Sequence, residues 1–362
     1  MGDQDPTQDR TKLRGRLKDT LKATFALKSI HDLYRKSPCL VDPDHAMKAA
    51  LVTSWGKPPQ YISIPDLPPP TPTQVQLKVL ASSVTRVVRS RAAGAHSTAF
   101  KAPLPYDPSV DGVAIDEITG DMYFITQLAA PLFAERTNVD MRHVIRLDEG
   151  TDPVKVAALA NPVSCSWMTL RCRVIGGCQG RTVLIIGATT TSGRCAEIVA
   201  RSLGATRIIG MSRNEETLAA VEGLDDRVVL REPFALPPSV GPVHIVLDYI
   251  GSGPAAPGIF QTAQSVYGEN LQYVQVGNIL NRPHMFDVMP IYLINHRPLC
   301  ILGTGVGCFT VEDWRRELPE IMKMISHMHI PFPIFTVPLS GVASAWESED
   351  TLTKRLVLMP GA

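Results

Sequence analysis

The sequence has little net charge and no long apolar run. Its 36 Lys and Arg residues are balanced by 35 Asp and Glu residues, which leaves a formal net charge of +1 at pH 7. Because such a chain carries no field of one sign, nothing indicates a nucleic acid or an anionic membrane as partner. No apolar run approaches the ~18 to 20 residues that cross a bilayer. We therefore expect neither a membrane span nor a nucleic-acid partner.

Paired cysteines are also absent. The seven cysteines include no Cys-x-x-Cys spacing, and an odd number in mostly apolar segments is typical of reduced thiols. The first residues carry acidic side chains where a secretory signal is basic, so we expect a cytoplasmic protein. Cys165 and Cys172 are expected on one helix and Cys178 in the following loop, which favours buried thiols over a zinc site.

Residues 1–46 differ in composition from the rest of the chain. Leu13, Leu17, Leu21 and Phe25 recur every four residues among Lys and Arg side chains, a spacing that predicts a basic amphipathic helix. We interpret the segment as a loosely attached basic extension, flexible or helical. A membrane-surface helix, a partner helix and a mitochondrial presequence are the alternatives, and the acidic start disfavours the presequence.

From Met47 the sequence contains short β-type runs. Strands are expected at residues 48–53, 61–64 and 75–80. The proline-rich stretch 65–72 is expected to connect the last two. This pattern predicts a partly open β-barrel, to which a final β-type run at residues 354–360 is expected to return.

A second change of composition occurs near Asp152, which is placed to cap a helix that begins at Pro153. Beyond it, strand-like and helical runs alternate regularly. The strands are expected at residues 182–186, 207–211, 227–230 and 244–247, and helices at residues 194–203 and 215–221. Such alternation predicts an α/β fold with a parallel sheet covered on both faces.

A run of small residues joins the strand at 182–186 to the helix at 194–203. It consists of Gly187, Ala188, Thr189, Thr190, Thr191, Ser192 and Gly193. Small side chains let the backbone approach a pyrophosphate, whose charge is met by free N–H groups at the start of the helix. The run lacks the G-x-G-x-x-G pattern, so an ordinary strand-to-helix connection is the alternative. We predict that it binds a dinucleotide.

The next strand leads into Ser212 and Arg213. NAD-binding folds place Asp or Glu at this point, about 20 residues after the glycine turn, to bind the ribose hydroxyls. A hydroxyl and a guanidinium instead suit the 2′-phosphate of NADPH. Glu215 follows closely, but we expect it in the first turn of a helix, where a negative charge is favoured. The sequence therefore predicts NADPH as the cofactor.

Three further strand ends carry residues that suit a ligand. Asp248, Gly277 and Gly303 follow apolar runs, and ligands of open α/β sheets bind at the carboxyl ends of strands. We predict that all three contribute to cofactor binding, the glycines by letting the backbone come close. Ordinary turn glycines are the alternative.

From Met47 onward the sequence resembles the zinc-independent, quinone oxidoreductase-like branch of the medium-chain dehydrogenase/reductase superfamily. The resemblance rests on residues 47–52, the helix start at 157–159, Gly187-Ala188 with Gly193, and the closing strand. It implies a Rossmann doubly wound parallel sheet at 161–309. This domain is inserted in a GroES-like, partly open β-barrel substrate domain at 47–160 and 310–362. The resemblance also implies a homodimer, with the nicotinamide held between the two domains.

The resemblance further implies catalysis without zinc. Thr85, Val110 and Pro162 stand where zinc-dependent relatives have metal ligands. Without a Lewis acid, hydrogen-bond donors must polarise a carbonyl, and hydride addition to an activated C=C or a quinone becomes the easier chemistry.

Six residues are placed by the resemblance near the nicotinamide end of the cleft. Thr85 and Asn161 are the catalytic candidates, because polar side chains amid apolar surroundings need partners. The substrate-binding candidates are Arg86, Arg89, Asp111 and Trp167. Structural roles are the alternatives, namely surface charges for the two arginines and packing for Trp167.

The sequence thus predicts an NADPH-dependent oxidoreductase that reduces an activated C=C or carbonyl in an enone, quinone or enoyl thioester. Two departures from the branch leave alternatives open. Residues 85–91 read TRVVRSR, without the usual tyrosine, and Thr190 replaces the middle glycine of the phosphate turn. The alternatives are a catalytically idle protein, a lyase or isomerase of the same fold, and an enoyl reductase that acts in trans on a carrier-bound chain in a biosynthetic pathway.

Overall fold

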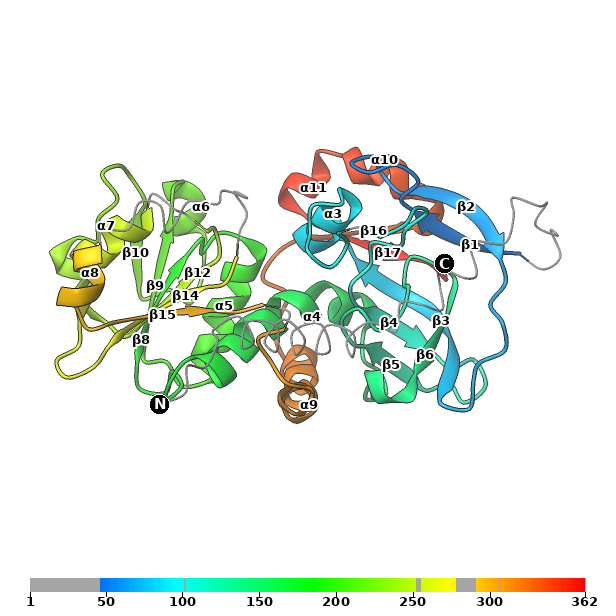
Figure 1. Ribbon diagram of the computed structural model, residues 1–362, viewed down its shortest axis with the longest axis horizontal. Helices are drawn as coiled ribbons and strands as arrows, with labels where there is room; N and C mark the ends of the chain where they lie inside the picture. Colours follow the sequence, from blue (N-terminus) through cyan, green and yellow to red (C-terminus); the bar gives the residue numbers. More distant parts are fainter. Residues whose placement is uncertain (1–45, 101, 252–254, 278–290, 306, 362) are drawn as a thin grey trace, which may run out of the picture.

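The computed structural model describes residues 46–100, 102–251, 255–277, 291–305 and 307–361. The helix predicted around Leu13 to Phe25 lies outside them. The described residues form two lobes side by side (Figure 1). Strands from both ends of the described chain share one lobe, and the middle of the chain forms the other.

One lobe is built on a six-stranded parallel sheet. Its strands, in spatial order, are β10 (Asp226–Val229), β9 (Arg207–Ser212), β8 (Thr182–Ile186), β12 (Ile245–Asp248), β14 (Leu271–Gln275) and β15 (Leu299–Gly303). Numbered along the chain, this order is 3-2-1-4-5-6, and it reverses between β8 and β12. Ligands of doubly wound sheets bind outside the carboxyl ends of the strands at such a reversal.

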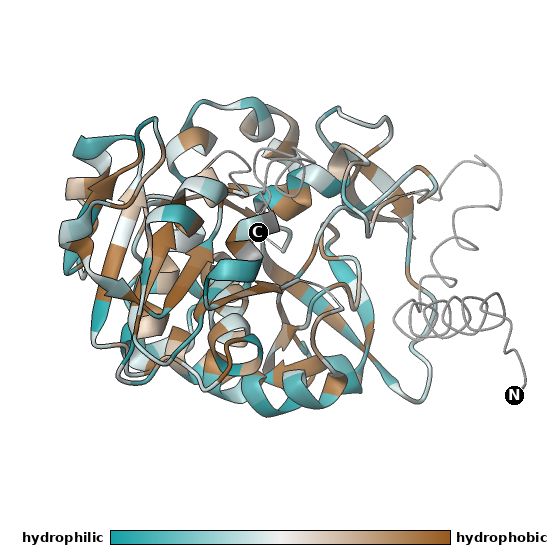
Figure 2. Cartoon of the chain, turned by 60° about the vertical axis from the view of Figure 1, so that its left-hand side comes forward, coloured by the Kyte–Doolittle hydropathy of each residue, from teal (hydrophilic) through white to brown (hydrophobic). Residues whose placement is uncertain are grey.

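Helices cover both faces of this sheet, as the sequence predicts. They include α5 (Thr191–Ser202), α6 (Glu215–Ala219), α7 (Ala255–Thr262) and α8 (Ile291–His296), and a short ladder pairs β11 (Pro242–Val243) with β13 (Gln264–Ser265). Alternate side chains of β8 point to opposite faces. Val183 and Ile185 join a core with α5, whereas Leu184 and Ile186 join a second core with α7. Figure 2 shows the apolar strands between these helices.

The other lobe is mostly antiparallel. Its main sheet runs β16 (Ile334–Pro338), β17 (Arg355–Met359), β3 (Gln74–Ser83), β4 (Gly112–Ile115), β5 (Met122–Ile125) and β7 (Val144–Arg146), with β6 (Arg136–Asp140) also paired to β3. A separate pair is formed by β1 (Ala46–Leu51) and β2 (Gln60–Pro65), and the helices are α3 (Arg86–Ala92), α10 (Val342–Glu347) and α11 (Asp350–Thr353). This arrangement agrees with the predicted partly open β-barrel, a fold that does not require the sheet to close into a complete barrel.

The last strand returns to the lobe in which the described chain begins. Leu358 of β17 pairs with Ser82 of β3, and Val357 pairs with Ser83. The parallel sheet is therefore an insertion between β7 and β16, as the sequence predicts.

Two helices lie between the lobes (Figure 1). The first, α4 (Pro153–Met168), packs against α5 and also against β3, β4 and β17, so both lobes share it. The second, α9 (Val311–His327), packs on α4. The boundary predicted between residues 160 and 161 falls inside α4. The exact domain limits therefore stay a prediction.

Candidate functional site

The small-residue run forms a tight turn between β8 and α5. Gly187 has a φ of +86°, and a Cβ added there would lie 2.8 Å from the side chain of Ile250. A Cβ on Gly193 would lie 2.2 Å from the carbonyl oxygen of Gly187. The first glycine is needed for its backbone conformation and the second for the close approach of α5 to β8. The start of α5 is thereby held at the carboxyl end of β8.

Thr190 stabilises this turn from within. Its hydroxyl donates to the Gly187 carbonyl at 2.8 Å and accepts from the Gly193 N–H at 3.0 Å, so that Thr190 is the N-cap of α5. The side chain that replaces the family's middle glycine is therefore bonded to the turn's own backbone. This arrangement is how the loop accommodates a larger residue at this position.

A second contact joins the turn to the end of β9. The hydroxyls of Thr189 and Ser212 lie 2.9 Å apart. Ser212 is buried, whereas Arg213, the next residue, is exposed and makes no ion pair with another described residue. The two segments predicted to bind the cofactor phosphates are thus in direct contact.

The ends of the other strands differ from one another. The carboxylate of Asp248 is buried and accepts from the N–H groups of Ile250 and Gly251 and from the Tyr273 hydroxyl, so it orients the turn after β12. A Cβ on Gly277 would lie 2.0 Å from the Tyr249 carbonyl, whereas a Cβ on Gly303 would have open space. A glycine is therefore required at position 277, because a side chain there would collide with the backbone of Tyr249. The cofactor contacts of these three residues stay predictions.

Charged residues gather where α3 and β17 approach the other lobe. Asp111 is buried, and its Oδ2 has no hydrogen-bond partner among the described residues. Burial raises the pKa of this carboxyl to about 7, against the opposing effect of Arg355. Burial also lowers the pKa of Arg355 to about 10, an effect that nearby Arg86 and Arg89 increase and that Cys195 and Asp111 oppose. Arg355 thus lies within electrostatic reach of one carboxyl group and two other guanidinium groups.

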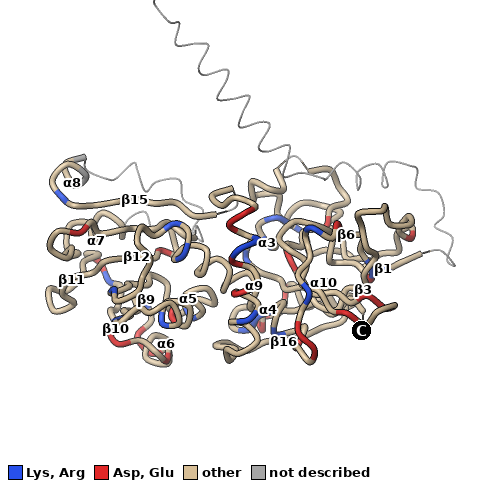
Figure 3. The backbone as a smooth tube through the Cα atoms, turned by 90° about the horizontal axis from the view of Figure 1, so that it is seen from below, with Lys and Arg blue, Asp and Glu red and all other residues tan. Residues whose placement is uncertain are grey.

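Two of these arginines are partly anchored. Arg89 donates to the Trp346 carbonyl at 3.0 Å and lies over the Trp346 ring, but its Nη2 is buried without a partner. Arg355 donates to the Val84 carbonyl at 3.4 Å, and its Nε has no hydrogen-bond partner in the described part of the chain. Arg86 is exposed. In Figures 1 and 3, α3 lies on the side of its lobe nearest the parallel-sheet lobe.

Thr85 begins α3. Its Oγ1 accepts from the Val88 N–H at 3.2 Å and caps the helix. The side chain is buried next to the charged cluster, and because a hydroxyl can accept and donate at once, its O–H remains able to donate. Asn161 lies half-buried in α4, and its side chain makes no hydrogen bond with another described residue.

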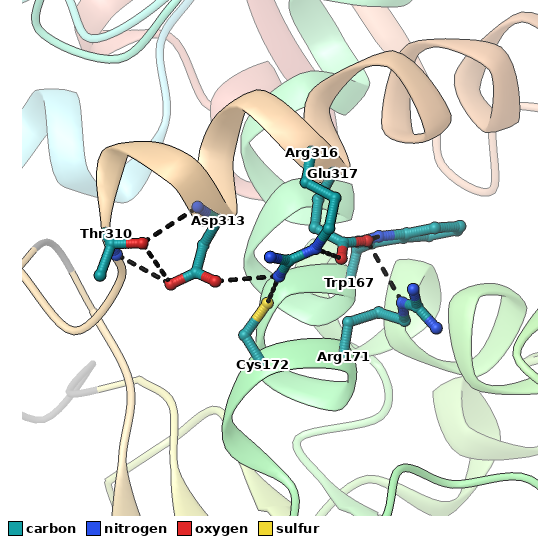
Figure 4. Close-up of polar contacts among 7 residues, drawn as sticks. All are labelled: Trp167, Arg171, Cys172, Thr310, Asp313, Arg316 and Glu317. Carbon is teal, nitrogen blue, oxygen red and sulfur yellow. Dashed lines mark hydrogen bonds and ion pairs between the residues drawn. The ribbon is translucent and has the colours of Figure 1, made fainter.

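Trp167 does not belong to the charged cluster but lies in the contact between α4 and α9. Its Nε1 donates to Glu317 at 2.8 Å, and the same carboxylate accepts from Arg171 and Arg316 (Figure 4). Although burial opposes the shift, hydrogen bonds from Trp167, Arg316 and Arg171 lower the pKa of Glu317. The indole N–H is committed to this network, as the packing alternative expects, and a substrate contact of Trp167 stays a prediction.

Neither a metal site nor a membrane span is found in the part of the chain that the structure describes. No three His, Cys, Asp or Glu side chains are grouped so as to hold an ion. No described helix is long and apolar enough to cross a bilayer. The shallow depression between residues 265–270 and Pro298 lies at the amino ends of β14 and β15, away from the turn and the charged cluster.

Comparison with known proteins identifies the family to which the chain belongs. No protein-family model matches the chain. The probable NADPH-dependent quinone reductase tdiC of Emericella nidulans is 46% identical over 356 residues, which cover 87% of this chain and 100% of that protein.

Solved structures share the fold. A putative NADPH:quinone reductase from Bacillus thuringiensis gives a TM-score of 0.72 at 14% identity and covers 87% of this chain and 99% of its own. The quinone oxidoreductase of Thermus thermophilus, also solved with NADPH, gives 0.67 at 21% identity and covers 86% and 100%. At 14% and 21% identity, the similarity to these structures shows only a shared fold. The 46% identity to tdiC, which extends over the whole of that protein, shows the family. The chain belongs to the quinone oxidoreductase-like branch of the medium-chain dehydrogenase/reductase superfamily.

Proposed function

We propose that this protein is an NADPH-dependent oxidoreductase that reduces an activated C=C or carbonyl group without zinc. Enones, quinones and enoyl thioesters are the substrate classes that suit this chemistry. The observation that carries the proposal is the hydrogen bond between Thr189 and Ser212, because it joins a glycine turn to a strand end that presents a hydroxyl and a guanidinium. The relative tdiC, a probable NADPH-dependent quinone reductase, supports it.

The residues of the parallel-sheet lobe fit this cofactor. Neither Gly187 nor Gly193 leaves room for a side chain, so α5 begins close to the sheet, where its N–H groups suit a pyrophosphate. Ser212 and Arg213 suit the 2′-phosphate. The open space at Gly303 leaves room beside β15 for the rest of the cofactor, which when bound supplies a hydride.

The charged cluster provides the substrate end of the proposed site. Arg86 and Arg89 would bind the substrate, with Arg355 beside them to add positive potential. The Thr85 hydroxyl and the Asn161 amide are donors that would polarise a carbonyl in place of a metal. Asp111 lies beside these groups as a carboxyl whose pKa is near 7. Arg355 was not predicted from the sequence, where it is only part of a returning strand.

The edge strand β15 supports the proposal of a homodimer. Among the described strands it pairs with β14 alone, and its sequence Leu299-Cys300-Ile301-Leu302 carries no charge that would block a further strand. Antiparallel pairing of β15 with its own copy across a two-fold axis is self-complementary. A cytoplasmic location stays part of the proposal, in keeping with the free cysteines among the described residues.

Steady-state kinetics test the proposed function. The full-length protein is offered NADPH with p-benzoquinone, cyclohexenone or a short enoyl-CoA, and consumption of NADPH is followed. We expect turnover of at least one substrate. Tight binding of NADPH without turnover of any of the three would instead support the idle protein.

Variants of Thr85 test the role of its hydroxyl. Thr85→Ser keeps both the cap of α3 and the donor, whereas Thr85→Val removes both. We expect kcat to fall at least tenfold in Thr85→Val and to remain near that of the unchanged protein in Thr85→Ser. An unchanged kcat in a folded Thr85→Val protein would restrict Thr85 to capping α3.

A further inference from the structure

The carboxyl ends of two neighbouring strands each lead into an arginine. β9 and β10 are parallel, with Ser212 opposite Val229. The N–H of Leu230 donates to the Ser212 carbonyl at 2.8 Å. Arg213 follows Ser212, and Arg231 follows Leu230. The backbone therefore places both arginines at one corner of the sheet, which β10 ends as its edge strand.

The two arginines differ in their partners. Arg231 Nη2 lies 3.2 Å from the carboxylate of Glu215, and both side chains are about three-quarters exposed, 73% and 74%. An ion pair this exposed contributes little to stability and exchanges readily for a stronger partner. Arg213 makes no ion pair with any described residue. Among the described residues, Arg213 thus has no ionic partner, and Arg231 has only a surface carboxylate.

Acidic side chains at this corner oppose the binding of a phosphate. Glu215 and Glu216 begin α6 directly after Arg213 and Asn214, and Glu232 follows Arg231. With Arg213 as the sole cation, these carboxylates would leave the corner negative and would repel a phosphate. A second guanidinium reduces that repulsion and supplies further N–H donors in the planar geometry that matches phosphate oxygens.

We propose that Arg231 is a second arginine of the site for the cofactor's 2′-phosphate, and that Glu215 is its resting partner. The inference rests on the proposed function in that the cofactor is NADPH. Binding of the phosphate replaces the carboxylate of Glu215 on Arg231, so Glu215 competes with the ligand. Arg231 is then a specificity residue, and Glu215 reduces the affinity that Arg231 provides.

Binding of adenosine 2′,5′-bisphosphate to the full-length protein, measured by calorimetry, tests the inference without any activity assay. Adenosine 5′-monophosphate, which lacks the 2′-phosphate, is the reference ligand. We expect Arg231→Ala to weaken binding of the bisphosphate at least fivefold and to leave binding of the monophosphate unchanged. We expect Glu215→Gln to tighten binding of the bisphosphate, because the neutral amide competes less.

Arg142→Ala is the matched control. Arg142 is an equally exposed arginine, paired with Asp140 at 2.8 Å in the other lobe, and its loss should change neither affinity. Circular dichroism confirms that each variant is folded. Unchanged bisphosphate affinity in Arg231→Ala, or an equal loss for both ligands, would overturn the role of Arg231. Unchanged affinity in Glu215→Gln would overturn the competition.

The proposed function and this inference fail in different ways. An unchanged protein that binds both nucleotides equally contradicts the choice of NADPH itself. A protein that prefers the bisphosphate, and keeps that preference in Arg231→Ala, contradicts only the part assigned to Arg231.

Discussion

Thr190 and Gly193 are linked by a 3.0 Å hydrogen bond in which the threonine hydroxyl accepts from the glycine N–H. The same hydroxyl donates to Gly187, so the phosphate-binding turn is closed by its own side chain. The residue that departs from the family pattern is thus bonded to the backbone of the turn that contains it. The turn is stabilised before any ligand is present.

Gly193→Ala tests the close approach of α5 to β8. The new Cβ would meet the Gly187 carbonyl at 2.2 Å, so the turn must open. We expect NADPH affinity to fall at least tenfold and the melting temperature to fall by several degrees. Gly305→Ala is the control, because nothing lies within 4 Å of a Cβ there. Equal effects of the two substitutions, measured by fluorescence titration and thermal unfolding, would contradict the account.

Asp111→Asn tests the buried carboxyl between the lobes. Burial raises its pKa from 3.8 to about 7, so the folded protein holds a proton that the unfolded chain releases near pH 4. The stabilisation that results from this extra bound proton is complete below about pH 4 and is lost as the pH rises towards about 7. Asparagine remains neutral throughout. We expect the variant to lose less stability than the unchanged protein between pH 5 and 8.

Thermal unfolding across that pH range checks the prediction, with Asp140→Asn as control. Hydrogen bonds from Arg142 hold the pKa of Asp140 well below its usual range, so it is ionised throughout and its loss should not alter the slope. Parallel pH curves for Asp111→Asn and the unchanged protein would show that Asp111 is ionised in the folded state.

The metal content of the purified protein tests the zinc-free chemistry. The family resemblance places Thr85, Val110 and Pro162 where zinc-dependent relatives have ligands, and Thr85 uses its oxygen to cap α3. We expect elemental analysis to find far less than one zinc per chain. One stoichiometric, chelator-sensitive zinc ion would refute this part of the proposal.

Arg213→Ala tests the first arginine of the 2′-phosphate site. Because the guanidinium is proposed to contact only that phosphate, NADPH affinity should fall about tenfold, whereas NADH affinity should stay nearly unchanged. Fluorescence titration with each cofactor provides both values. A variant that keeps its preference for NADPH would show that the end of β9 has been misinterpreted.

Local patterns in the sequence were sufficient to predict the parallel sheet and its phosphate turn. Residues 182–186 are continuously apolar after Thr182 and form β8 with those bounds. Small residues then separate this strand from an amphipathic helix, so strand, turn and helix are each recognisable within a few residues. The return of the last strand to the lobe in which the described chain begins was also predictable from the sequence, because a lone β-type run must pair with another strand.

Long-range contacts at the site were not predictable in this way. Asp111 and Arg355 are brought together because β3 pairs with both β17 and β4, which no local pattern specifies. Helix α3 was not predicted, because residues 85–91 were interpreted from the family pattern and not from helix signals, although Thr85 is a residue type that favours an N-cap. The partner of Trp167, Glu317, lies on α9, a helix that was not predicted from the sequence.

Titration of the full-length protein with NADPH and with NADH, followed by fluorescence, tests the central claim most directly. The account predicts that NADPH binds at least tenfold more tightly. Tenfold requires only ~1.4 kcal/mol, and one charge-assisted hydrogen bond contributes about 1.5 to 3 kcal/mol. Equal affinities for the two cofactors, or no binding of either at micromolar concentrations, would contradict it.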